Sequence, residues 1–436
     1  MPESLLQQQA RHYEQFRCIG ANCEDTCCDG WQVSIDRKTY EKYQQCSDPV
    51  LRPQLQQWVQ IQPAATSENT FAKIVLTGSR CPFLSEKLCS IQKQLGEDHL
   101  GKTCATFPRI NNQVAGVVER SLDLSCPEAA RLLLTDPSPA SFHQVEPGLN
   151  GCHTVDSGPD QASPYFWEIR SALLSLLQNR KYSVAKRLLL MGHVCDKLSE
   201  LARNGHDLLT PQVLEGFLFG IDAGLYDAHL QACSADAADQ LNTVLQLMAA
   251  RIQLDSTPQR YRDLYQEFVD GLQLKPELSL NECSNRYAQA YTRQYAPFLA
   301  MHEHMLEHYL VYYAYKTLFP FGSKALNASL PEDHRQNSFT AHYLLMASYF
   351  AMAQSFMIGL AAGYGPDFGP DHAIRCIQSC ARTLEHCTSY PSQVLQILSA
   401  KGIESAAGMS VLTQNPRYRE QAFEQNLSFV VAGAGR

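Results

Sequence analysis

The sequence predicts a mainly α-helical protein, in which a small cysteine-rich N-terminal domain with a few short strands precedes a larger all-helical domain. Beyond residue 164, apolar residues recur at intervals of three and four, the spacing of one face of a helix. Cysteine is concentrated at the other end, where nine of the sixteen lie within the first 126 of 436 residues. The helical periodicity and the cysteine content therefore both divide the chain between residues 126 and 164.

We expect residues 1–135 to form the cysteine-rich, cluster-binding domain from short elements. Asp36 is a good N-cap, and Pro127 fits the first turn of a helix. Alternation of apolar and polar residues indicates strands. The predicted elements are a helix near Leu5–Tyr13, a strand over Trp31–Ile35, a helix from Asp36 through Tyr43, strands over Phe71–Thr77 and Gln113–Glu119, and a helix from Pro127 through Leu134.

Residues 136–164 contain five prolines among Gly, Ser and Asp, which is typical of a linker or surface loop. We expect residues 165–436 to form the helical domain, which would bind substrate and cofactor. The predicted helices cover Phe166–Leu177, Ala185–Leu201, Val213–Leu230, Ala237–Ile252, Arg260–Leu272, Arg286–Leu318, Phe339–Ala362 and Asp371–Cys387.

Charge and hydropathy exclude several classes of protein. The net charge of −8 and the lack of a basic stripe argue against a nucleic-acid partner. The N-terminus has neither the basic nor the apolar region of a secretory signal. The apolar stretch from Tyr343 to Ala362 is interrupted by Ser, Gln and Gly, which indicates a buried helix and not a membrane span. We expect a cytoplasmic protein.

Eight of the early cysteines fall in short motifs, and they are our candidate metal ligands. Disulfides are rare in the cytosol, and thiolates select Zn²⁺, Cu(I) or iron–sulfur clusters. The alternative is that some are small buried hydrophobic residues. Cys27 and Cys28 are adjacent and cannot easily point at one metal, so we expect them to differ in role. The candidates are Cys18, Cys23, Cys27, Cys28, Cys81, Cys89, Cys104 and Cys126.

The sequence around these cysteines resembles that of the flagellin lysine-N-methylases, a family with an N-terminal cysteine-rich zinc- or iron-chelating domain. The resemblance spans residues ~16–321 and so includes both halves of the chain. It is carried by Phe16-Arg17-Cys18-Ile19-Gly20, Glu24-Asp25-Thr26-Cys27-Cys28-Asp29-Gly30-Trp31, Cys81-Pro82-Phe83-Leu84, Ser90-Ile91-Gln92-Lys93, Cys104 with Phe107-Pro108-Arg109, Cys126-Pro127-Glu128-Ala129-Ala130, Glu307-His308-Tyr309-Leu310 and Lys316-Thr317-Leu318-Phe319-Pro320-Phe321.

The resemblance implies methyl transfer from S-adenosylmethionine to lysine ε-amines of flagellin, by a protein that carries an iron–sulfur cluster. It favours a [4Fe-4S] cluster, and zinc stays an alternative. The residues themselves show no strand followed by a Gly-rich turn and a helix, so a Rossmann-type site is not supported. They also lack the C-x3-C-x2-C spacing of radical enzymes, because the third position falls on Gly30.

A lysine must lose a proton before it can accept a methyl group, which calls for an acidic or phenolic base. We name Tyr309 and Glu307, on a tyrosine-rich predicted helix, as the catalytic candidates. The alternative function is a non-catalytic zinc or iron–sulfur module that binds a protein partner. The two hypotheses differ in whether the chain binds S-adenosylmethionine.

Overall fold

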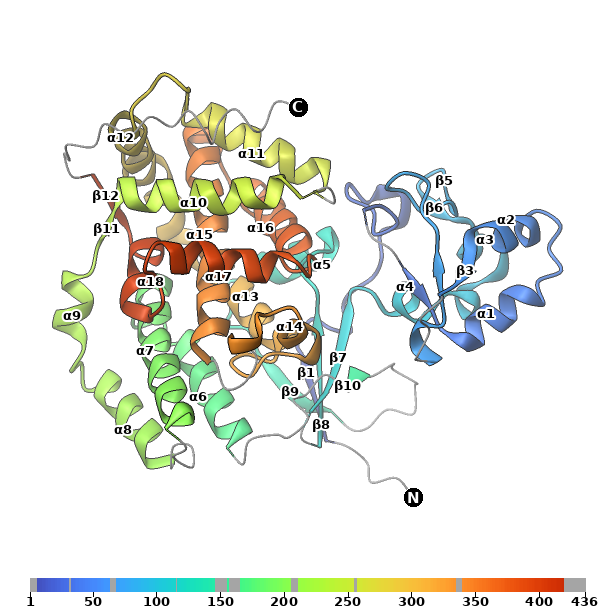
Figure 1. The fold of residues 1–436 in the computed structure, drawn as a ribbon, viewed down its shortest axis with the longest axis horizontal. Coiled ribbons are helices and arrows are strands. Elements are labelled where there is room, and N and C mark those ends of the chain that lie inside the picture. Colours follow the sequence, from blue (N-terminus) through green and yellow to red (C-terminus); the bar gives the residue numbers. More distant parts are fainter. Residues whose placement is uncertain are drawn as a thin grey trace.

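The structure, a computed structural model, is mainly helical, with a small lobe of short elements beside a large helical body (Figure 1). It describes residues 6–30, 33–62, 68–114, 116–145, 155–156, 165–204, 211–254, 257–334 and 339–418. Cys152, Trp31 and most of the predicted linker lie outside these residues.

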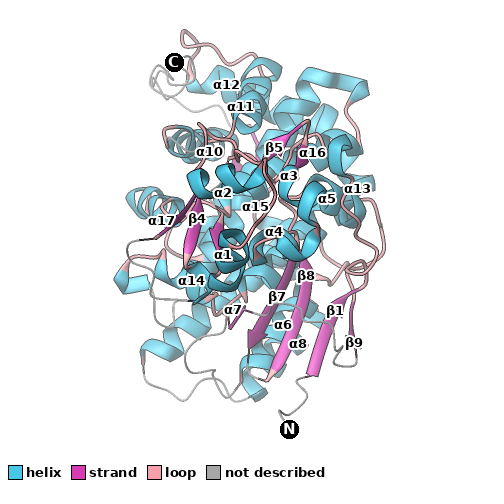
Figure 2. Ribbon diagram, turned by 90° about the vertical axis from the view of Figure 1, so that its right-hand side faces the viewer, coloured by secondary structure: helices cyan, strands magenta, loops and turns pink. Residues whose placement is uncertain are grey.

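A five-stranded sheet pairs the first described residues of the chain with strands from residues 109–156, and it lies against the helical body. Its strand order is β10-β7-β8-β1-β9, with β1 parallel to β8 and antiparallel to β9. Figure 2 shows β7, β8, β1 and β9 side by side. The strands are β1 (Leu6–Ala10), β7 (Arg109–Val114), β8 (Val117–Leu122), β9 (Phe142–Val145) and β10 (Val155–Asp156).

The small lobe has a hydrophobic core of its own, formed by residues between Val33 and Ile91. Its first helix begins where the sequence predicts, because the Asp36 carboxylate accepts a hydrogen bond from the Thr39 N–H at 3.0 Å. The elements are β2 (Ser34–Ile35), α1 (Arg37–Gln44), α2 (Leu51–Trp58), β3 (Val59–Ile61), β4 (Ala72–Ile74), β5 (Leu84–Ser85), β6 (Leu88–Cys89), α3 (Ser90–Leu95) and α4 (Lys102–Thr106).

The helical body packs around one long central helix, α15. The helices are α5 (Pro127–Leu134), α6 (Phe166–Leu177), α7 (Val184–Arg203), α8 (Pro211–Asp222), α9 (Asp227–Ala232), α10 (Ala237–Ile252), α11 (Gln259–Gly271), α12 (Leu280–Ala290), α13 (Ala296–Thr317), α14 (Lys324–Ala328), α15 (Phe339–Tyr364), α16 (Pro370–Leu384), α17 (Tyr390–Ala400) and α18 (Ala406–Thr413). A short π-helical segment, Tyr291–Tyr295, joins α12 to α13.

Helix α15 is long and apolar enough to cross a membrane, but its apolar stretch is buried inside the protein. A helix that is apolar on all sides needs neighbours on all sides, and α7, α11, α16 and α18 supply them. The contact with α11 is especially close: a Cβ atom on Gly271 would lie 2.1 Å from the Gly359 carbonyl oxygen. Glycine is required there, and α15 is the core helix that the sequence predicts.

Several details differ from the sequence prediction. Residues 113–119 are not one strand, because they fall on the end of β7 and the start of β8, which pair antiparallel. The predicted helix over 286–318 is divided between α12, the π-helical segment and α13. Residues 6–10 form a strand and not a helix, because β8 and β9 both offer backbone hydrogen bonds that outweigh the helix propensity of Leu and Gln. The predicted helix over 213–230 is two helices, because the chain turns at Gly224 with φ +74°. The helical half also contains one pair of two-residue strands, β11 (Ala235–Asp236) and β12 (Pro416–Arg417).

The hydrophobic packing does not divide at residue 135. Tyr13, Phe16 and helix α5 belong to the large core of the helical body, whereas the small core ends at Ile91. Residues 142–145 and 155–156, from the predicted linker, contribute strands to the sheet. The division of the chain into a domain over 1–135, a linker and a domain over 165–436 stays a prediction.

Candidate cysteine-lined cavity

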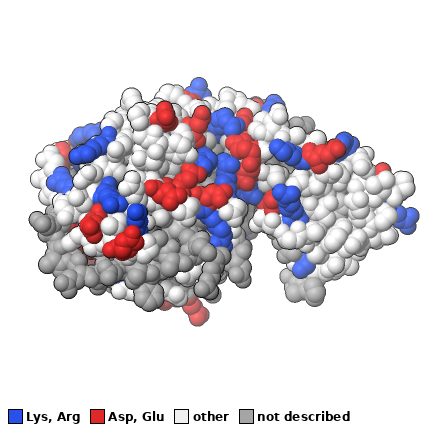
Figure 3. Space-filling view, turned by 90° about the horizontal axis from the view of Figure 1, so that it is seen from above, with Lys and Arg blue, Asp and Glu red and all other residues white. Residues whose placement is uncertain are grey.

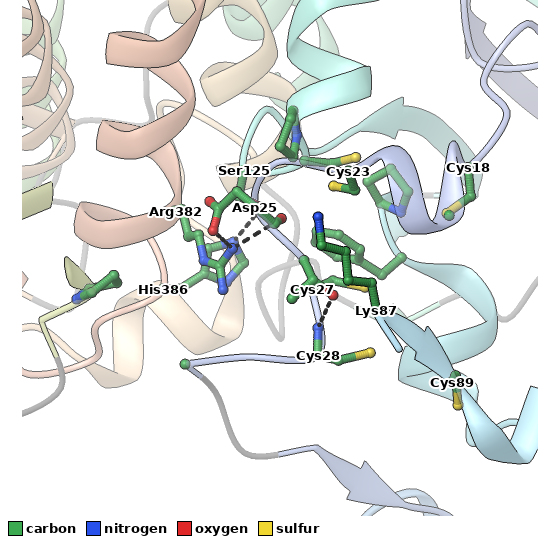
Figure 4. A pocket seen from close by; sticks show the side chains of 18 of the residues that line it. Cys18, Cys23, Asp25, Cys27, Cys28, Lys87, Cys89, Ser125, Arg382 and His386 are labelled. Carbon is green, nitrogen blue, oxygen red and sulfur yellow. Dashed lines mark hydrogen bonds and ion pairs between the residues drawn. The ribbon is translucent and has the colours of Figure 1, made fainter. Parts of the chain in front are cut away.

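A cavity of about 430 Å³ lies where the small lobe meets the helical body, and six of the eight candidate cysteines line it. Figure 4 shows Cys18, Cys23, Cys28 and Cys89 around this cavity, with Arg382 and His386 on the helical side. The lining consists of Phe16, Cys18, Gly20, Cys23, Asp25, Thr26, Cys27, Cys28, Gly30, Lys87, Leu88, Cys89, Gln92, Phe107, Pro108, Ser125, Cys126, Pro127, Arg251, Pro258, Arg382 and His386.

Local backbone geometry brings distant cysteines together. The Cys81 N–H donates to the Cys28 carbonyl oxygen at 2.9 Å, which ties the first cysteine group to the second. Cys89 and Cys126 each stand immediately before a helix, α3 and α5. Gly20 takes φ +56°, a left-handed conformation that suits glycine, as the loop turns toward Leu88.

Backbone N–H groups point at several of the sulfur atoms. Cys23 receives such a hydrogen bond from Asp25, Cys81 from Phe83, and Cys89 from Ile91 and Gln92. The Cys126 sulfur receives two, from Glu128 and Ala129 at the start of α5. Hydrogen bonds to sulfur stabilise thiolates, and they are also found around cluster ligands.

Cys81 and Cys104 do not line the cavity, but they lie close to cysteines that do. Loss of hydration raises the pKa of Cys104, and the neighbouring Cys28, Cys89 and Cys81 thiolates raise it further. Burial likewise raises the pKa of Cys81 to about 11. All eight candidates therefore belong to one thiol-rich region, whereas Cys46, outside the candidate set, is buried in the small core.

The Cys28 thiol differs from its neighbours. A hydrogen bond with Cys27 lowers the pKa of Cys28 to about 7, with further help from Thr26 and the Arg382 guanidinium, against the effect of burial. The pKa of Cys27 is raised, first by the same hydrogen bond and then by burial. The shared hydrogen bond therefore shifts the pKa values of the two adjacent thiols in opposite directions, and their different roles stay a prediction.

These cysteines are not arranged around a single metal ion. In the part of the chain that the structure describes, no three His, Cys, Asp or Glu side chains form a group that could hold one. A tetrahedral zinc site, with Zn–S bonds of about 2.3 Å, places its sulfur atoms about 3.8 Å apart. A multinuclear cluster suits a wider set, because each thiolate binds a different iron atom.

Helix α16 holds the cysteine loop against the helical body. Arg382 forms an ion pair with Asp25, with Nη1 and Oδ1 2.5 Å apart (Figure 4). It also donates to the Asp29 carbonyl oxygen. Gln378 Nε2 donates to Asp25 Oδ2 and to the Ser125 carbonyl oxygen, each at 2.8 Å. One helix from the C-terminal half thus fixes both cysteine-bearing segments, residues 18–28 and 125–127.

The catalytic candidates Glu307 and Tyr309 lie elsewhere, on α13. Glu307 is 1% exposed and forms ion pairs with Arg187 at 2.6 Å and Arg180 at 2.9 Å. The Tyr309 ring is buried in the large core, where its hydroxyl has no hydrogen-bond partner among the described residues. Neither residue lines the cavity. Several polar residues do line it, among them Asp25, Ser125, Arg382 and His386, and none was named as a site residue from the sequence. Asp25 and Ser125 stand in the cysteine motifs, whereas Arg382 and His386 stand in no motif.

Charged side chains of both signs are interspersed on the face that Figure 3 shows, most densely near the junction of body and lobe. That face carries no uninterrupted basic surface.

Comparison with known proteins agrees with the resemblance that the cysteine motifs suggest. Residues 170–412 match the model of the FliB lysine N-methylase C-terminal domain. The lysine-N-methylase of Salmonella typhimurium is 36% identical over 124 residues, 28% of this chain and 31% of that protein. The flagellar biosynthetic protein FliU of Salmonella muenchen is 36% identical over 123 residues, which is 73% of its length.

The match thus covers about a third of the Salmonella lysine-N-methylases. No solved structure matches this chain. The family model, in contrast, covers more than half of the 436 residues and most of the helical body. The chain therefore belongs to the FliB lysine N-methylase family.

Proposed function

We propose that this protein transfers methyl groups from S-adenosylmethionine to lysine ε-amines of flagellin, and that its cysteine-lined cavity holds an iron–sulfur cluster. The activity rests on family membership and on relatives named lysine-N-methylase and flagellar biosynthetic protein. The observation that carries the proposal is the cavity itself, because it brings six thiols and a set of polar groups from the helical body to one place.

The donor set fits a cluster. Thiolates are the usual ligands of iron–sulfur clusters, and N–H groups directed at sulfur are typical of their surroundings. Six cysteines line the cavity and could reach a cluster there, whereas Cys81 and Cys104 are neighbours of the lining cysteines. The six are Cys18, Cys23, Cys27, Cys28, Cys89 and Cys126. A bound cluster would supply thiolate-coordinated iron, and it would tie the loop over 18–28 to the small lobe.

The cavity is also large enough for part of a small-molecule cosubstrate, since ligand pockets measure about 300–1,000 Å³. Phe107 contributes an aromatic ring to the lining, and aromatic rings attract cations such as a sulfonium. In the proposed transfer, the lysine Nζ lone pair attacks the methyl carbon. The carbon–sulfur bond then breaks, its electrons stay on sulfur, and S-adenosylhomocysteine leaves.

The proposal is tested with protein purified without oxygen and incubated with S-adenosylmethionine and Salmonella flagellin. We expect flagellin lysines to gain mass in steps of about 14 Da, and the protein to contain iron and sulfide at about four each per chain. Stoichiometric zinc without sulfide would overturn the cluster. Cluster-loaded protein that neither binds S-adenosylmethionine nor modifies flagellin would support the alternative, a non-catalytic binding module.

Cysteine variants give a matched control. Cys126→Ser removes a cavity thiol and should lower the iron content, because metal binding and local folding are coupled. Cys195→Ser changes a fully buried cysteine in α7 that does not line the cavity, and should leave the iron content unchanged. Equal loss in the two variants would mean that the cavity is not the metal site.

A further inference from the structure

The turn between β5 and β6 brings a lysine into the wall of the cysteine-lined cavity. Ser85 pairs with Leu88 across the two strands, so Glu86 and Lys87 form the whole of a two-residue turn. Both residues are left-handed, with φ +50° and φ +63°. A tight turn of this kind requires positive φ at both central residues and is most often built from Asn and Gly. The backbone therefore disfavours a lysine at this position.

The two side chains of the turn have different surroundings. Glu86 Oε2 lies 3.7 Å from Nζ of Lys93, a residue of α3 that does not line the cavity. Lys87 does line the cavity, and Figure 4 shows its side chain pointing into it. The next residue, Leu88, contacts the cysteine loop, because a Cβ atom on Gly20 would lie 3.4 Å from Leu88 Cδ2. The turn thus lies against that loop with its lysine directed into the cavity.

Lys87 differs from the two arginines of the lining in having no partner. Arg382 is paired with Asp25. Arg251 donates from Nε to the Thr383 carbonyl oxygen at 2.9 Å. Among the residues that the structure describes, the Lys87 ammonium has neither a hydrogen-bond acceptor nor a carboxylate beside it. A turn with an unfavourable backbone conformation therefore presents an unpaired positive charge to the cavity, and such outliers are common where a ligand binds.

An unpaired ammonium favours an anionic group on the ligand. The thiols already have a cation beside them, because the Arg382 guanidinium contributes to lowering the pKa of Cys28. Near Lys87, the lining includes apolar side chains such as those of Leu88 and Pro108. A ligand with a large uncharged part and one carboxylate would match this distribution. In S-adenosylmethionine the adenosyl group is uncharged, and the carboxylate of the amino-acid end is the only anionic group.

We propose that Lys87 binds the carboxylate of S-adenosylmethionine and so fixes the amino-acid end of the methyl donor in the cavity; this inference rests on the proposed methyl transfer. The ammonium donates to a carboxylate oxygen, and a hydrogen bond between charged groups is stronger than one between neutral groups. Holding this end restricts the orientation of the methyl group, which favours transfer. Because the turn is short, little chain entropy is lost when the lysine binds.

Variants of Lys87 separate its charge from its place in the turn. Lys87→Met removes the charge, and the dissociation constant for S-adenosylmethionine should rise about tenfold. Lys87→Arg keeps the charge and should keep most of the affinity. Lys87→Gly relieves the left-handed strain, so the protein should be at least as stable as before, yet its affinity should fall as in Lys87→Met. The matched control is Lys93→Met, which removes a nearby ammonium that does not line the cavity.

The experiment is a binding titration of cluster-loaded protein, prepared without oxygen, with S-adenosylmethionine and with its decarboxylated form. The decarboxylated form has no group for Lys87 to bind, so Lys87→Met should not weaken its binding. Iron content should be the same in Lys87→Met as in the unaltered protein. Added salt should weaken the binding of S-adenosylmethionine more in the unaltered protein than in Lys87→Met, because salt screens the exposed charge pair.

Three results would overturn the inference while leaving the proposed function in place. The first is an unchanged affinity of Lys87→Met for S-adenosylmethionine. The second is an equal loss of affinity for both ligands, which would mean that the lysine does not act on the carboxylate. The third is a loss of iron in Lys87→Met, which would assign the charge to the cluster. If the unaltered, cluster-loaded protein does not bind S-adenosylmethionine, the proposed function fails and this inference fails with it.

Discussion

Glu307 shows how burial changes the meaning of a residue that the sequence marks as a catalytic candidate. Its carboxylate accepts hydrogen bonds from two arginines, and burial, which would raise its pKa, is outweighed by Arg180 and Arg187, which lower it. A carboxylate held in this way is a poor base for an incoming amine. Through Arg187, it links α13 to the first turn of α7. Through Arg180, it links α13 to the loop between α6 and α7.

We therefore expect Glu307→Gln to act on stability. It leaves the Arg187 guanidinium, 2% exposed, beside a neutral amide, and breaking a buried ion pair costs about 3–5 kcal/mol. Chemical denaturation should show this loss. Glu303→Gln is the control, because Glu303 is 29% exposed and lies 3.5 Å from Arg187, so its loss should be about 1 kcal/mol. Unchanged stability with slowed methyl transfer would instead support the catalytic assignment.

His342 is a buried imidazole in α15 whose titration should govern acid stability. Burial lowers the pKa of His342 to about 4, from 6.5 in the unfolded chain. Between these values the unfolded state binds more protons, so stability is full above pH 6.5 and is lost as the pH falls toward 4. The loss amounts to roughly 3 kcal/mol at 1.36 kcal/mol per pKa unit.

His342→Gln should flatten this dependence, whatever its effect on stability at neutral pH. The free energy of unfolding, measured in urea at intervals from pH 7.5 to 4.5, checks the prediction. His334→Gln alters a more exposed histidine and should keep the original slope. If His342→Gln keeps that slope as well, the acid sensitivity arises at other groups.

At the scale of elements, helix α16 couples the helical body to the cysteine loop through Gln378 and Arg382. Arg382→Met should loosen the loop and lower the iron content at least twofold, without loss of helical circular dichroism, because the body has a separate core. Arg375→Met is the control. It lies on the same helix and pairs with Glu267, outside the cavity lining. Equal iron content in both variants would contradict the role of α16.

The sequence predicts helices in this protein better than strands and loops. Helices α5, α6 and α10 have the predicted bounds, because each has an apolar stripe with the helical period and a core to bury it. Strand β1 was missed, because its pairing with β8 and β9 depends on residues more than 100 positions away. Local propensity contains no information about such partners.

The same limit applies to the candidate site. Cysteines in short motifs are visible in the sequence, so six of the residues lining the cavity were predicted from it. Arg382 and His386 stand in an ordinary helical pattern with no local motif. They are also more than 350 residues away in sequence from Asp25 and Asp29, which Arg382 contacts. They become functional candidates only when folding places α16 beside the cysteine loop. Glu307 and Tyr309 show the opposite case. Their local sequence suggested a catalytic role, but folding buries both side chains away from the cavity lining.

On the scale of the whole molecule, two hydrophobic cores of very unequal size meet at the cysteines. The large core includes α15 and its neighbours, whereas the small core lies between Val33 and Ile91, with Cys81 and Cys89 packed partly against it. A small core buries too little apolar surface to be very stable alone. Metal–thiolate bonds at its edge would therefore contribute a large share of the stability of the small lobe.

If the proposed cluster is bound, its removal should for this reason unfold the two parts unequally. After iron is removed with a chelator under reducing conditions, amide hydrogen exchange should become fast over residues 33–106, whereas amides of α15 stay protected, since local opening follows the weakest core. Exchange detected by mass spectrometry distinguishes the two regions in one sample. The Cys195→Ser protein, treated alike, should show the same division. Uniform acceleration would mean that the lobes unfold together, and unchanged exchange over 33–106 would mean that the small core holds without the metal.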